Sequence, residues 1–491
     1  MKQSSVHCPP SSALRPQSPE PRASSVPGHQ PSVLGPRSLV QQSSALAPSS
    51  TASEQSSVPS PQSSVQQPSS NNPSSVLCPL SSALNSSIER FQRWLSRVGY
   101  ASYDPYDIWG TPYALKARAL YYRKNPFGLF AIAPILAIDI LAPSLRSLFV
   151  RKDRFATADA QLLLAFLNLH QVTRDSDYLT KARSLAKDLL SYSIRGYSGH
   201  CWGYPFDWQN PRGLWRKNTP YITCTPYCFE AFLGLYEVTG EDQHLEVARS
   251  IARFVHQDLK EVPTSSDAAA GSYSPHDESQ VVNAGAYRAM VLFEAAARWS
   301  DSKYAESAHR NLNYILQAQQ EDGSWLYATD GSGNFIDHFH TCFNLKNLWK
   351  LNRRLGDSSV CDSIQRGWHY YRSALFSDDG LPMTYAKSPR TETVKLEMYN
   401  MAEAITLGAL LGDDIPEALV MAEDLALRLA RDYQLPDGHF VTRVYRGGLR
   451  HTFPFIRWPQ AQLFYALTNL YGALGERMRP RVSDLVPSPG S

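Results

Sequence analysis

The chain has 491 residues, and its 48 lysines and arginines nearly balance its 45 aspartates and glutamates, giving a formal net charge of +3 at pH 7. Charges of both signs are interspersed, which excludes the strongly basic surface of a protein that binds nucleic acid by electrostatic attraction. The seven cysteines show no zinc-type paired spacing. Cys224 and Cys228 form the only close pair, and we expect buried free thiols, as in a reducing cytoplasm, with a metal or disulfide pair as the alternative.

Residues 1–85 are rich in serine, proline and glutamine and repeat short Ser-Ser-Val and Ser-Ser-Ala-Leu units. Such a segment has almost no apolar surface to bury, so its composition predicts a disordered tail. The first residues also lack the basic start and apolar run of a cleavable signal peptide. We therefore expect one folded domain at residues 86–476, followed by a second disordered tail at residues 477–491.

The most apolar stretch is residues 127–149, which is interrupted by Pro134, Asp139, Pro143 and Arg146. It falls short of the uninterrupted run of about 20 apolar residues that a membrane-spanning helix needs. We expect a buried helix and a connector here. If the fold left this stretch uncovered, it would be an exposed apolar patch able to make a peripheral membrane contact.

From residue 156 onward, segments with apolar residues at helical spacing follow one another in pairs. The expected pairs are residues 156–175 with 178–194, 225–240 with 244–259, 279–300 with 303–320, 343–356 with 359–376, and 398–412 with 415–433, and a single last helix spans 457–474. Turns within most pairs are short and combine a helix stop with the cap of the next helix. Connections between pairs are mostly much longer, up to about 35 residues, well beyond the usual length.

Alternating short and long connections place all long loops at one end of a helical array. The unpaired last helix needs a partner, and an early helix at residues 86–98 or 111–124 can close the array with it. Closure removes the exposed edges that an open solenoid would have to cap. The predicted fold is therefore all-α, an (α/α)6 toroid of helical hairpins with long aromatic loops on one face.

Several long loops contain a glycine turn followed by aromatic residues. Asp322, Asp379 and Asp437 each precede a glycine, and an Asp-Gly turn followed by alternating aromatic residues is typical of a small β-hairpin. Hairpins alone do not explain so many Trp, Tyr, His and Arg residues at one end of a toroid. A sugar needs flat apolar rings to stack on and fixed hydrogen-bonding groups around its hydroxyls, so we expect a glycan site there.

Five motifs, in the same order along the chain, resemble bacterial six-hairpin glycosidase-like proteins associated with surface-polysaccharide biosynthesis. They are GYSGHCWGYPFDWQN, TPYITCTPYCFEAFLGLYEVTG, SYSPHDESQVVNAGAYRAM, EDGSWLYATDGSGNFIDHFHTCFNL and IRWPQAQLFYALTNL, within residues 94–474. The wider six-hairpin class includes hydrolases, lyases and epimerases, so the resemblance implies a fold and a carbohydrate-related role but no single reaction. Where it implies an acidic residue and a histidine before the fifth pair, this chain has Glu397 and Tyr399.

The segment Asp337-His338-Phe339-His340 enters the fourth hairpin. Asp337 and His340 are three residues apart and share one side of the first helical turn, so the carboxylate can orient the imidazole for general acid or base catalysis. The structural alternative is that Asp337 only caps the helix and that both histidines pack among neighbouring aromatic residues.

The loop CWGYPFDWQN supplies a second candidate group. In the functional interpretation, Trp202, Tyr204 and Trp208 stack on sugar, and Asp207 provides a carboxylate across the cavity from Asp337. In the structural one, the tryptophans anchor a long loop. Weaker substrate-binding candidates, for which a cap or core contact is the alternative, are Asp277, Asn283, Trp325, Tyr327, Glu397 and Arg457.

These residues leave three functions open for a protein that acts on an oligosaccharide or polysaccharide. Hydrolysis would use Asp207 and Asp337 as acid and base, and we favour it slightly. A uronate lyase or epimerase would exchange a proton between His340 and Tyr399, with Arg457 holding the carboxylate. A binding or assembly protein would keep the aromatic residues without catalysis. No phosphate-cradling loop, serine elbow or zinc motif is present in the sequence, so no cofactor or metal is expected.

Overall fold

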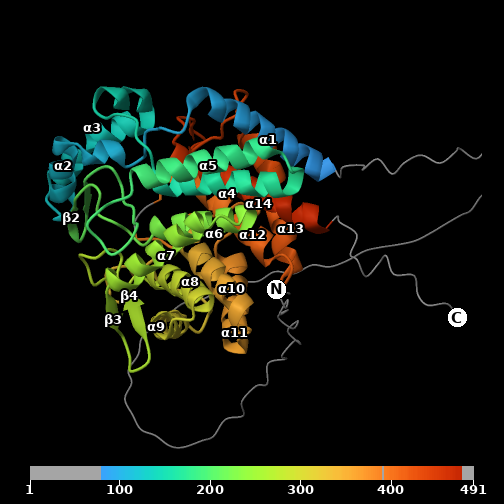
Figure 1. The fold of residues 1–491 in the computed structure, drawn as a ribbon. Helices are drawn as coiled ribbons and strands as arrows, with labels where there is room; N and C mark the ends of the chain where they lie inside the picture. The colour runs from blue at the N-terminus through green and yellow to red at the C-terminus, as the bar shows by residue number, and fades with distance from the viewer. Residues whose placement is uncertain (1–78, 390–391, 478–491) are drawn as a thin grey trace, which may run out of the picture. The chain divides into compact units, whose positions relative to one another are not determined.

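The computed structural model describes residues 79–389 and 392–477, which are mostly helical (Figure 1). The α-helices are α1 (Pro79–Val98), α2 (Pro112–Tyr122), α3 (Gly128–Leu141), α4 (Ala156–Thr173), α5 (Ser176–Ser191), α6 (Thr225–Thr239), α7 (Asp242–Gln257), α8 (Val282–Trp299), α9 (Ser302–Ala318), α10 (His338–Leu355), α11 (Ser358–Ala374), α12 (Met398–Leu411), α13 (Pro416–Arg428) and α14 (Ala461–Arg477). Short helical turns are η1 (Asp107–Gly110), η2 (Pro143–Leu148), η3 (Leu429–Tyr433) and η4 (Ile456–Gln460).

The strands are short and lie in the connections between helices. They are β1 (Trp208–Asn210), β2 (Gly213–Trp215), β3 (Glu261–Pro263), β4 (Ala269–Gly271), β5 (Ile336–Asp337), β6 (Tyr385–Lys387), β7 (Val394–Glu397), β8 (Arg443–Tyr445) and β9 (Arg450–His451). Strands β1 and β2, and β3 and β4, form hairpins within one connection. Strands β5 and β6, and β7, β8 and β9, join different connections.

Six helices form a closed inner ring. Helices α4, α6, α8, α10, α12 and α14 contact one another in that order, and α14 returns to α4. Each of the first five packs against the helix that follows it in sequence, and α1 packs on α14 as the sixth outer helix. The expected (α/α)6 toroid is confirmed, and of the two proposed closing helices the first is the partner, because α2 packs on α3 instead.

The inner and outer helices differ in how their apolar residues are distributed. Twelve of the 14 residues of α12 are buried, since an inner helix contacts neighbours on all sides. Helix α5 buries only one stripe, formed by Ala182, Leu185, Ala186 and Leu189 at spacings of three and four residues. Helices that are buried on nearly all sides therefore form the inner ring, and helices with one apolar stripe form the outer ring.

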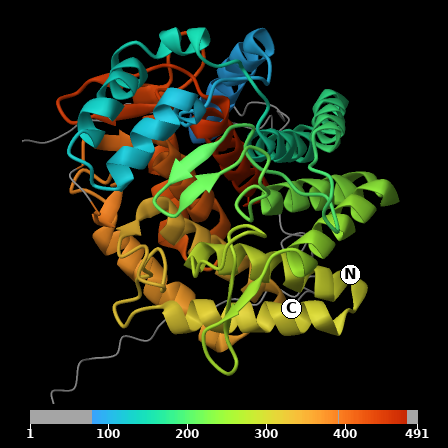
Figure 2. The same ribbon diagram turned by 90° about the vertical axis from the view of Figure 1, so that its left-hand side faces the viewer.

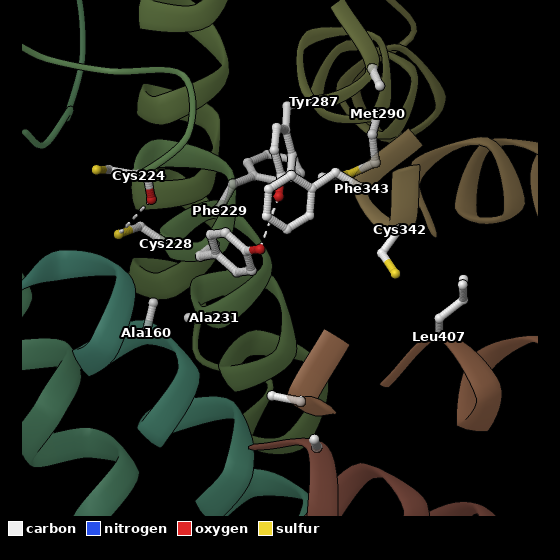
Figure 3. Packing of buried hydrophobic residues seen from close by; sticks show 14 of the residues in the cluster. Ala160, Cys224, Cys228, Phe229, Ala231, Tyr287, Met290, Cys342, Phe343 and Leu407 are labelled. Carbon is white, nitrogen blue, oxygen red and sulfur yellow. Dashed lines mark hydrogen bonds between the residues drawn. The ribbon is translucent and has the colours of Figure 1, made fainter. Parts of the chain in front are cut away.

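Side chains from the inner helices fill the centre of the ring (Figure 3). The hydroxyls of Tyr227 and Tyr287 are 2.9 Å apart and hydrogen bonded. Lys346 of α10 and Glu403 of α12 form a buried ion pair. Cys224 and Cys228, on one face of α6, are buried free thiols as expected.

All the long connections lead from the end of an outer helix into the start of an inner helix, so they share one end of the ring, which we call the mouth. Figure 2 looks onto the side that carries the two β-hairpins and helices α2 and α3. The opposite ends of the inner helices lead into short turns, two of which use glycine in the left-handed region, Gly240 (φ 69°) and Gly356 (φ 63°).

Hydrogen bonds tie neighbouring connections to one another around the mouth. The backbone N–H of Ile222 donates to Tyr273 (3.0 Å), that of Val282 donates to Tyr327 (3.1 Å), and that of Ile456 donates to the hydroxyl of Ser102 (3.1 Å). The pairing of β5 with β6 and of β7 with β8 adds further backbone hydrogen bonds between neighbouring connections. The mouth is therefore a hydrogen-bonded framework that holds its side chains in fixed positions.

The Asp-Gly turns are hairpins, as predicted. The glycines that follow Asp322, Asp379 and Asp437 have φ values of 90°, 74° and 111°. Each turn brings two flanking residues into an isolated antiparallel bridge, Gln319 with Trp325, Phe376 with Pro382, and Gln434 with Phe440. These three aspartates are turn residues and take no further part in the site.

Two boundaries differ from the expectation. Residues 79–85, which we assigned to the tail, form the start of α1, and Leu84 is fully buried. Arg477, assigned to the second tail, ends α14. Residues 1–78 and 478–491, the remainder of both predicted tails, lie outside the described part of the chain.

The expected buried helix within residues 127–149 is only half buried. Helix α3 buries one stripe, formed by Gly128, Ile132, Ile135 and Asp139, and leaves its other face exposed. The reason is that α3 packs mainly on α2 and η2, and a small separate core formed by α3 with α2 and η1 covers only one side of it. None of the described helices is long and apolar enough to cross a membrane.

Candidate functional site

Aromatic rings from the long connections and the first turns of the inner helices form a continuous belt around the mouth. The aromatic belt consists of Tyr106, Tyr204, Trp208, Trp215, Tyr221, Tyr273, Phe339, Tyr399 and Trp458. Neighbouring rings lie with their centroids between 3.8 and 6.4 Å apart. Since these residues come from segments far apart in sequence, the toroid fold itself assembles the belt.

Asp337 and His340 form the pair that their spacing predicted. Asp337 is the N-cap of α10: its Oδ1 accepts a hydrogen bond from the backbone N–H of His340 at 2.9 Å. Its Oδ2 lies 2.6 Å from Nδ1 of the same histidine. Both the capping role and the imidazole-orienting role are therefore present, because the carboxylate has one oxygen for each.

The imidazole of His340 has aromatic neighbours and one remaining nitrogen. Tyr327 and Phe339 lie with ring centroids 4.6 and 4.3 Å from it. Among the described residues, Nε2 has no hydrogen-bond partner, and 17% of the side chain is exposed. A histidine whose Nδ1–H is held by a carboxylate presents Nε2 as a proton acceptor.

His338 has the structural role that we gave as the alternative. It is fully buried and its Nε2 is hydrogen bonded to the Tyr371 hydroxyl at 2.8 Å. Burial lowers the pKa of His338 to about 3, so it enters the core as a neutral ring. The two histidines, two residues apart, therefore face different surroundings.

Glu397 occupies the N-cap position of the neighbouring inner helix α12, as Asp337 does in α10, but its side chain makes no capping hydrogen bond. It is buried, and its Oε2 lies 3.3 Å from Nε of Arg443. Burial raises the pKa of Glu397, and Arg443 opposes that shift. The structure thus places a buried carboxyl with a raised pKa at the start of α12, next to α10, which carries His340.

Tyr399 and Trp458 stack face to face, 3.8 Å apart and within 5° of parallel. Only 4% of Tyr399 is exposed, and burial, together with Tyr227 and Glu403, raises the pKa of its hydroxyl well above the ordinary value. Tyr399 is therefore a neutral residue beneath Trp458, suited to donating a hydrogen bond but not to accepting a proton.

Arg457 is buried and ion-paired. Its guanidinium makes a bidentate contact with Asp104, with Nη2 2.8 Å from Oδ1, and it lies over the rings of Tyr204 and Trp458. Asp104 was not singled out in the sequence, because 353 residues separate the two partners. The fork that we expected to bind a substrate anion is occupied by this carboxylate.

The loop candidates separate into two groups. Tyr204 and Trp208 are half-buried members of the belt, whereas Trp202 and Trp325, expected to stack on sugar, are core residues. Their indole N–H groups donate to the carbonyls of Leu189 (2.9 Å) and Ile315 (3.0 Å), near the ends of α5 and α9. These tryptophans anchor the loops to the preceding helices.

Asp207 is held by partners within its own connection. Its carboxylate accepts hydrogen bonds from Arg216 (3.0 Å) and from the backbone N–H of Lys217 (2.8 Å) within the β1–β2 connection. Asp277 likewise accepts hydrogen bonds from the backbone N–H groups of Tyr273, Ser274 and Ser279 and organises its own turn. The structure therefore gives both aspartates local structural partners.

Asn283 stands out for the opposite reason. It lies in the first turn of α8, it is 1% exposed, and neither its Oδ1 nor its Nδ2 has a hydrogen-bond partner in the described structure. Thr223, Asn344 and Asn400 also carry a buried, partnerless oxygen, and each lies near the start of an inner helix. Buried polar atoms usually have partners, so these groups are available to bind hydroxyls.

Several members of the site were not predicted from the sequence. Tyr106, Trp215, Phe339 and Trp458 belong to the belt, although none of them was a candidate site residue. The segment Asp104-Pro105-Tyr106-Asp107-Ile108-Trp109 carries the same mixture of aspartate and aromatic residues as the loops we selected, and that signal could have identified Tyr106.

A hollow of about 690 Å³ lies at the other end of the ring. It is lined by the last turns of α4, α10, α12 and α14, with Trp349 and Arg353 among the lining residues. Two ion pairs lie around this end, Lys350 with Glu230 and Arg477 with Asp413. The oriented histidine and the aromatic belt are both at the mouth, so we assign the candidate site to the mouth.

The chain matches no protein-family model and no curated protein sequence. Solved structures, however, share its architecture. An inactive variant of an α-1,6-mannanase of Salegentibacter sp., in complex with α-1,6-mannotriose, has a TM-score of 0.53 and 12% identity over 80% of this chain and 99% of that chain. An unsaturated glucuronyl hydrolase specific for heparin has a TM-score of 0.53 and 10% identity over 82% and 98%.

A sugar epimerase from a ruminal bacterium has a TM-score of 0.51 and 11% identity over 67% of this chain and 90% of that chain. The shared architecture is the six-hairpin toroid. At these identities the likeness shows the fold alone, and enzymes with three different activities share it. The reaction must therefore be argued from the residues of the mouth.

Proposed function

We propose that this protein is a carbohydrate-active enzyme of polysaccharide metabolism, which binds a glycan against the aromatic belt and uses His340 as its general acid or base. The observation that carries the proposal is the 2.6 Å contact between Asp337 Oδ2 and His340 Nδ1, at the edge of the belt. The resemblance of the motifs to polysaccharide-biosynthesis proteins favours a biosynthetic role. The structural neighbours, which act on sugars by their printed names, support the substrate class.

The belt suits a sugar for a physical reason. The C–H faces of a pyranose stack on Trp and Tyr rings, while its hydroxyls require fixed donors and acceptors at the edges. Half-buried rings such as Trp208 and Trp458 supply the faces. Asn283 and Asn400 carry partnerless amide atoms that can bind the hydroxyls.

The geometry favours proton transfer by the histidine over hydrolysis by Asp207 and Asp337. Both oxygens of Asp337 are engaged by His340, and Asp207 is held by Arg216 and Lys217. The free atom of the pair is Nε2 of His340, which can accept a proton from a sugar carbon or hydroxyl. A lyase or epimerase reaction on a uronate or reducing sugar is therefore the first candidate.

Hydrolysis remains the second candidate through a different carboxyl. Glu397 has a pKa raised by burial, as a general acid requires. Glu397 stands at the N-cap position of α12, adjacent to α10, which carries His340, so a buried acid and an oriented base come from neighbouring helices.

The test is incubation of the purified protein with free and lipid-linked oligosaccharides in D2O, followed by mass spectrometry. Deuterium uptake indicates epimerisation, an unsaturated product indicates a lyase, and a shortened glycan indicates hydrolysis. His340→Gln should abolish the product, whereas His369→Gln, on the exposed face of outer helix α11, should not. Product formation unchanged in His340→Gln would refute the catalytic assignment, and binding without any product would leave a glycan-binding protein.

A further inference from the structure

An apolar surface stands exposed beside the mouth. The apolar patch comprises Phe127, Leu129, Phe130, Leu141, Leu145, Leu148 and Phe149, from α3, η2 and the residues next to them. Phe127, Phe130, Leu141 and Leu148 are 72–79% exposed. Large exposed apolar side chains gathered in this way mark an interaction surface, unlike single ones scattered over a protein.

The composition of α3 is not that of a helix whose outer face is in contact with water. Its sequence GLFAIAPILAIDIL contains one polar side chain, Asp139, and that residue is on the buried face. Its exposed residues are all apolar: Leu129, Phe130, Ala133, Pro134, Leu136, Ala137 and Leu141. A helix that is apolar all round is normally covered by protein or by lipid.

Exposed basic residues flank the patch in the sequence. Lys116, Arg123 and Lys124 precede it, and Arg151 and Lys152 follow it. Between residues 112 and 152 the only acidic residue is Asp139, which is ion-paired with buried Arg146. The segment therefore combines an apolar surface with an unbalanced positive charge.

The patch is fixed to the framework of the mouth. Arg146 lies over the ring of Phe455, 5.0 Å from its centroid, and reaches Asp107 at 3.0 Å. Nε2 of His451, in β9, is 2.9 Å from the carbonyl oxygen of Asp139. A surface anchored by these buried contacts keeps one orientation relative to the aromatic belt.

We propose that this apolar patch with its basic rim docks the protein on the surface of a membrane that contains anionic lipids. Apolar side chains enter the boundary between headgroups and acyl chains, while lysine and arginine stay at the level of the lipid phosphates. The charge imbalance argues for lipid over a second copy of the chain, since two such patches would repel each other. Helix α3, with 14 residues and Pro134 within it, lies on the bilayer and does not cross it.

Docking by this surface would bring the mouth of the toroid close to the bilayer, because α3 lies in the connection between α1 and α4 and its contacts are to mouth residues. Under the proposed function, a glycan carried on a membrane lipid is then the substrate class that fits. The docking itself does not depend on catalysis, so its test is separate.

The experiment is flotation of the full-length protein with vesicles of phosphatidylcholine alone and of phosphatidylcholine with about 30% phosphatidylglycerol. We expect binding to the anionic vesicles that weakens with salt. Leu129→Glu with Phe130→Glu should lower the partition coefficient by at least about tenfold, since two exposed apolar side chains no longer enter the lipid. Val420→Glu, at a valine of α13 that is 65% exposed, is the matched control and should bind like the wild type.

A second variant tests the charges. Lys116→Gln with Arg123→Gln and Lys124→Asn should lower binding to anionic vesicles by about fivefold per charge and remove most of its salt dependence. Thermal unfolding should be unchanged in every variant, because the altered side chains are exposed. The proposal is overturned if the wild type floats with neither vesicle, if the double glutamate variant floats like the wild type, or if that variant instead converts a wild-type dimer into a monomer.

Discussion

Replacing Asp337 with Asn tests the catalytic assignment most directly. In the wild type, Oδ2 of Asp337 accepts a hydrogen bond from Nδ1–H of His340 over 2.6 Å, which leaves Nε2 of the neutral ring free to take a proton. An Asn Oδ1 can still accept from the backbone N–H of His340. Its amide NH2 would then face Nδ1, and Nδ1 must become the acceptor, so the proton moves to Nε2.

The expected effects on rate and stability therefore differ widely. A general base held in the wrong tautomer, without its carboxylate, should lower turnover by about 10²–10⁴-fold. The free energy of unfolding should change by no more than about 1 kcal/mol, because Asn and Asp are equivalent N-caps. Asp301→Asn is the matched control: Asp301 caps outer helix α9 through the backbone N–H of Lys303 at 2.9 Å, away from the mouth.

Two measurements check this reasoning. Turnover is followed by mass spectrometry with the oligosaccharide found in the substrate screen, and the protonated nitrogen of His340 is identified by ¹⁵N NMR. Turnover in Asp337→Asn equal to that of Asp301→Asn would show that Asp337 only caps the helix. An Nε2–H tautomer already present in the wild type would contradict the orientation of the ring from which the argument starts.

Three further predictions concern stability. Burial lowers the pKa of His338 to about 3 from 6.5, so between pH 3 and pH 6.5 the unfolded chain binds more protons than the native chain. The free energy of unfolding should therefore fall as the pH falls, by about 2 kcal/mol at pH 5. His338→Gln should remove this part of the pH dependence measured by urea unfolding. A chain that begins at residue 86 should be at least about 2 kcal/mol less stable in urea than one that begins at residue 79, because it lacks Leu84, which is fully buried. Glu403→Gln should cost about 3–5 kcal/mol in thermal unfolding by leaving the buried ammonium of Lys346 unpaired, whereas Glu403→Leu with Lys346→Met should be nearly neutral.

The fold could be predicted because its signals are local. Helical periodicity, short capped turns and long connections are properties of neighbouring residues, and together they fix the number of hairpins and the end at which the long loops lie. The Asp-Gly hairpins followed from the same kind of signal. The sequence could not decide between α1 and α2 as the helix that closes the ring, because both have apolar residues at helical spacing. That choice depends on which apolar faces meet in the folded protein.

The site was harder to predict because burial and pairing depend on distant residues. Trp202 and Trp208 stand in the same loop, yet one donates to the carbonyl of Leu189 in the core and the other lies in the belt. Arg457 looks like an anion site until Asp104, 353 residues away, is placed beside it. The contact between Asp337 and His340 could be predicted because the two residues are three positions apart at the start of one helix, a local relation.

The repeat architecture places Asp337 and His340 at the start of one inner helix and Glu397, the residue that precedes the following hairpin, at the start of the next. Asp337 and Glu397 are the N-caps of adjacent inner helices, followed three residues later by His340 and Asn400. Equivalent positions of neighbouring hairpins lie side by side around the ring, and the inner helices all begin at the mouth. Their N-terminal N–H groups therefore face the same region and favour negative charge there. Asp337 uses this position to cap its helix and orient His340, while Glu397, buried and without a capping hydrogen bond, has a raised pKa. One structural position, repeated in two hairpins, thus provides an oriented histidine and a buried carboxyl with a raised pKa, the two kinds of group that acid and base chemistry on a glycan requires.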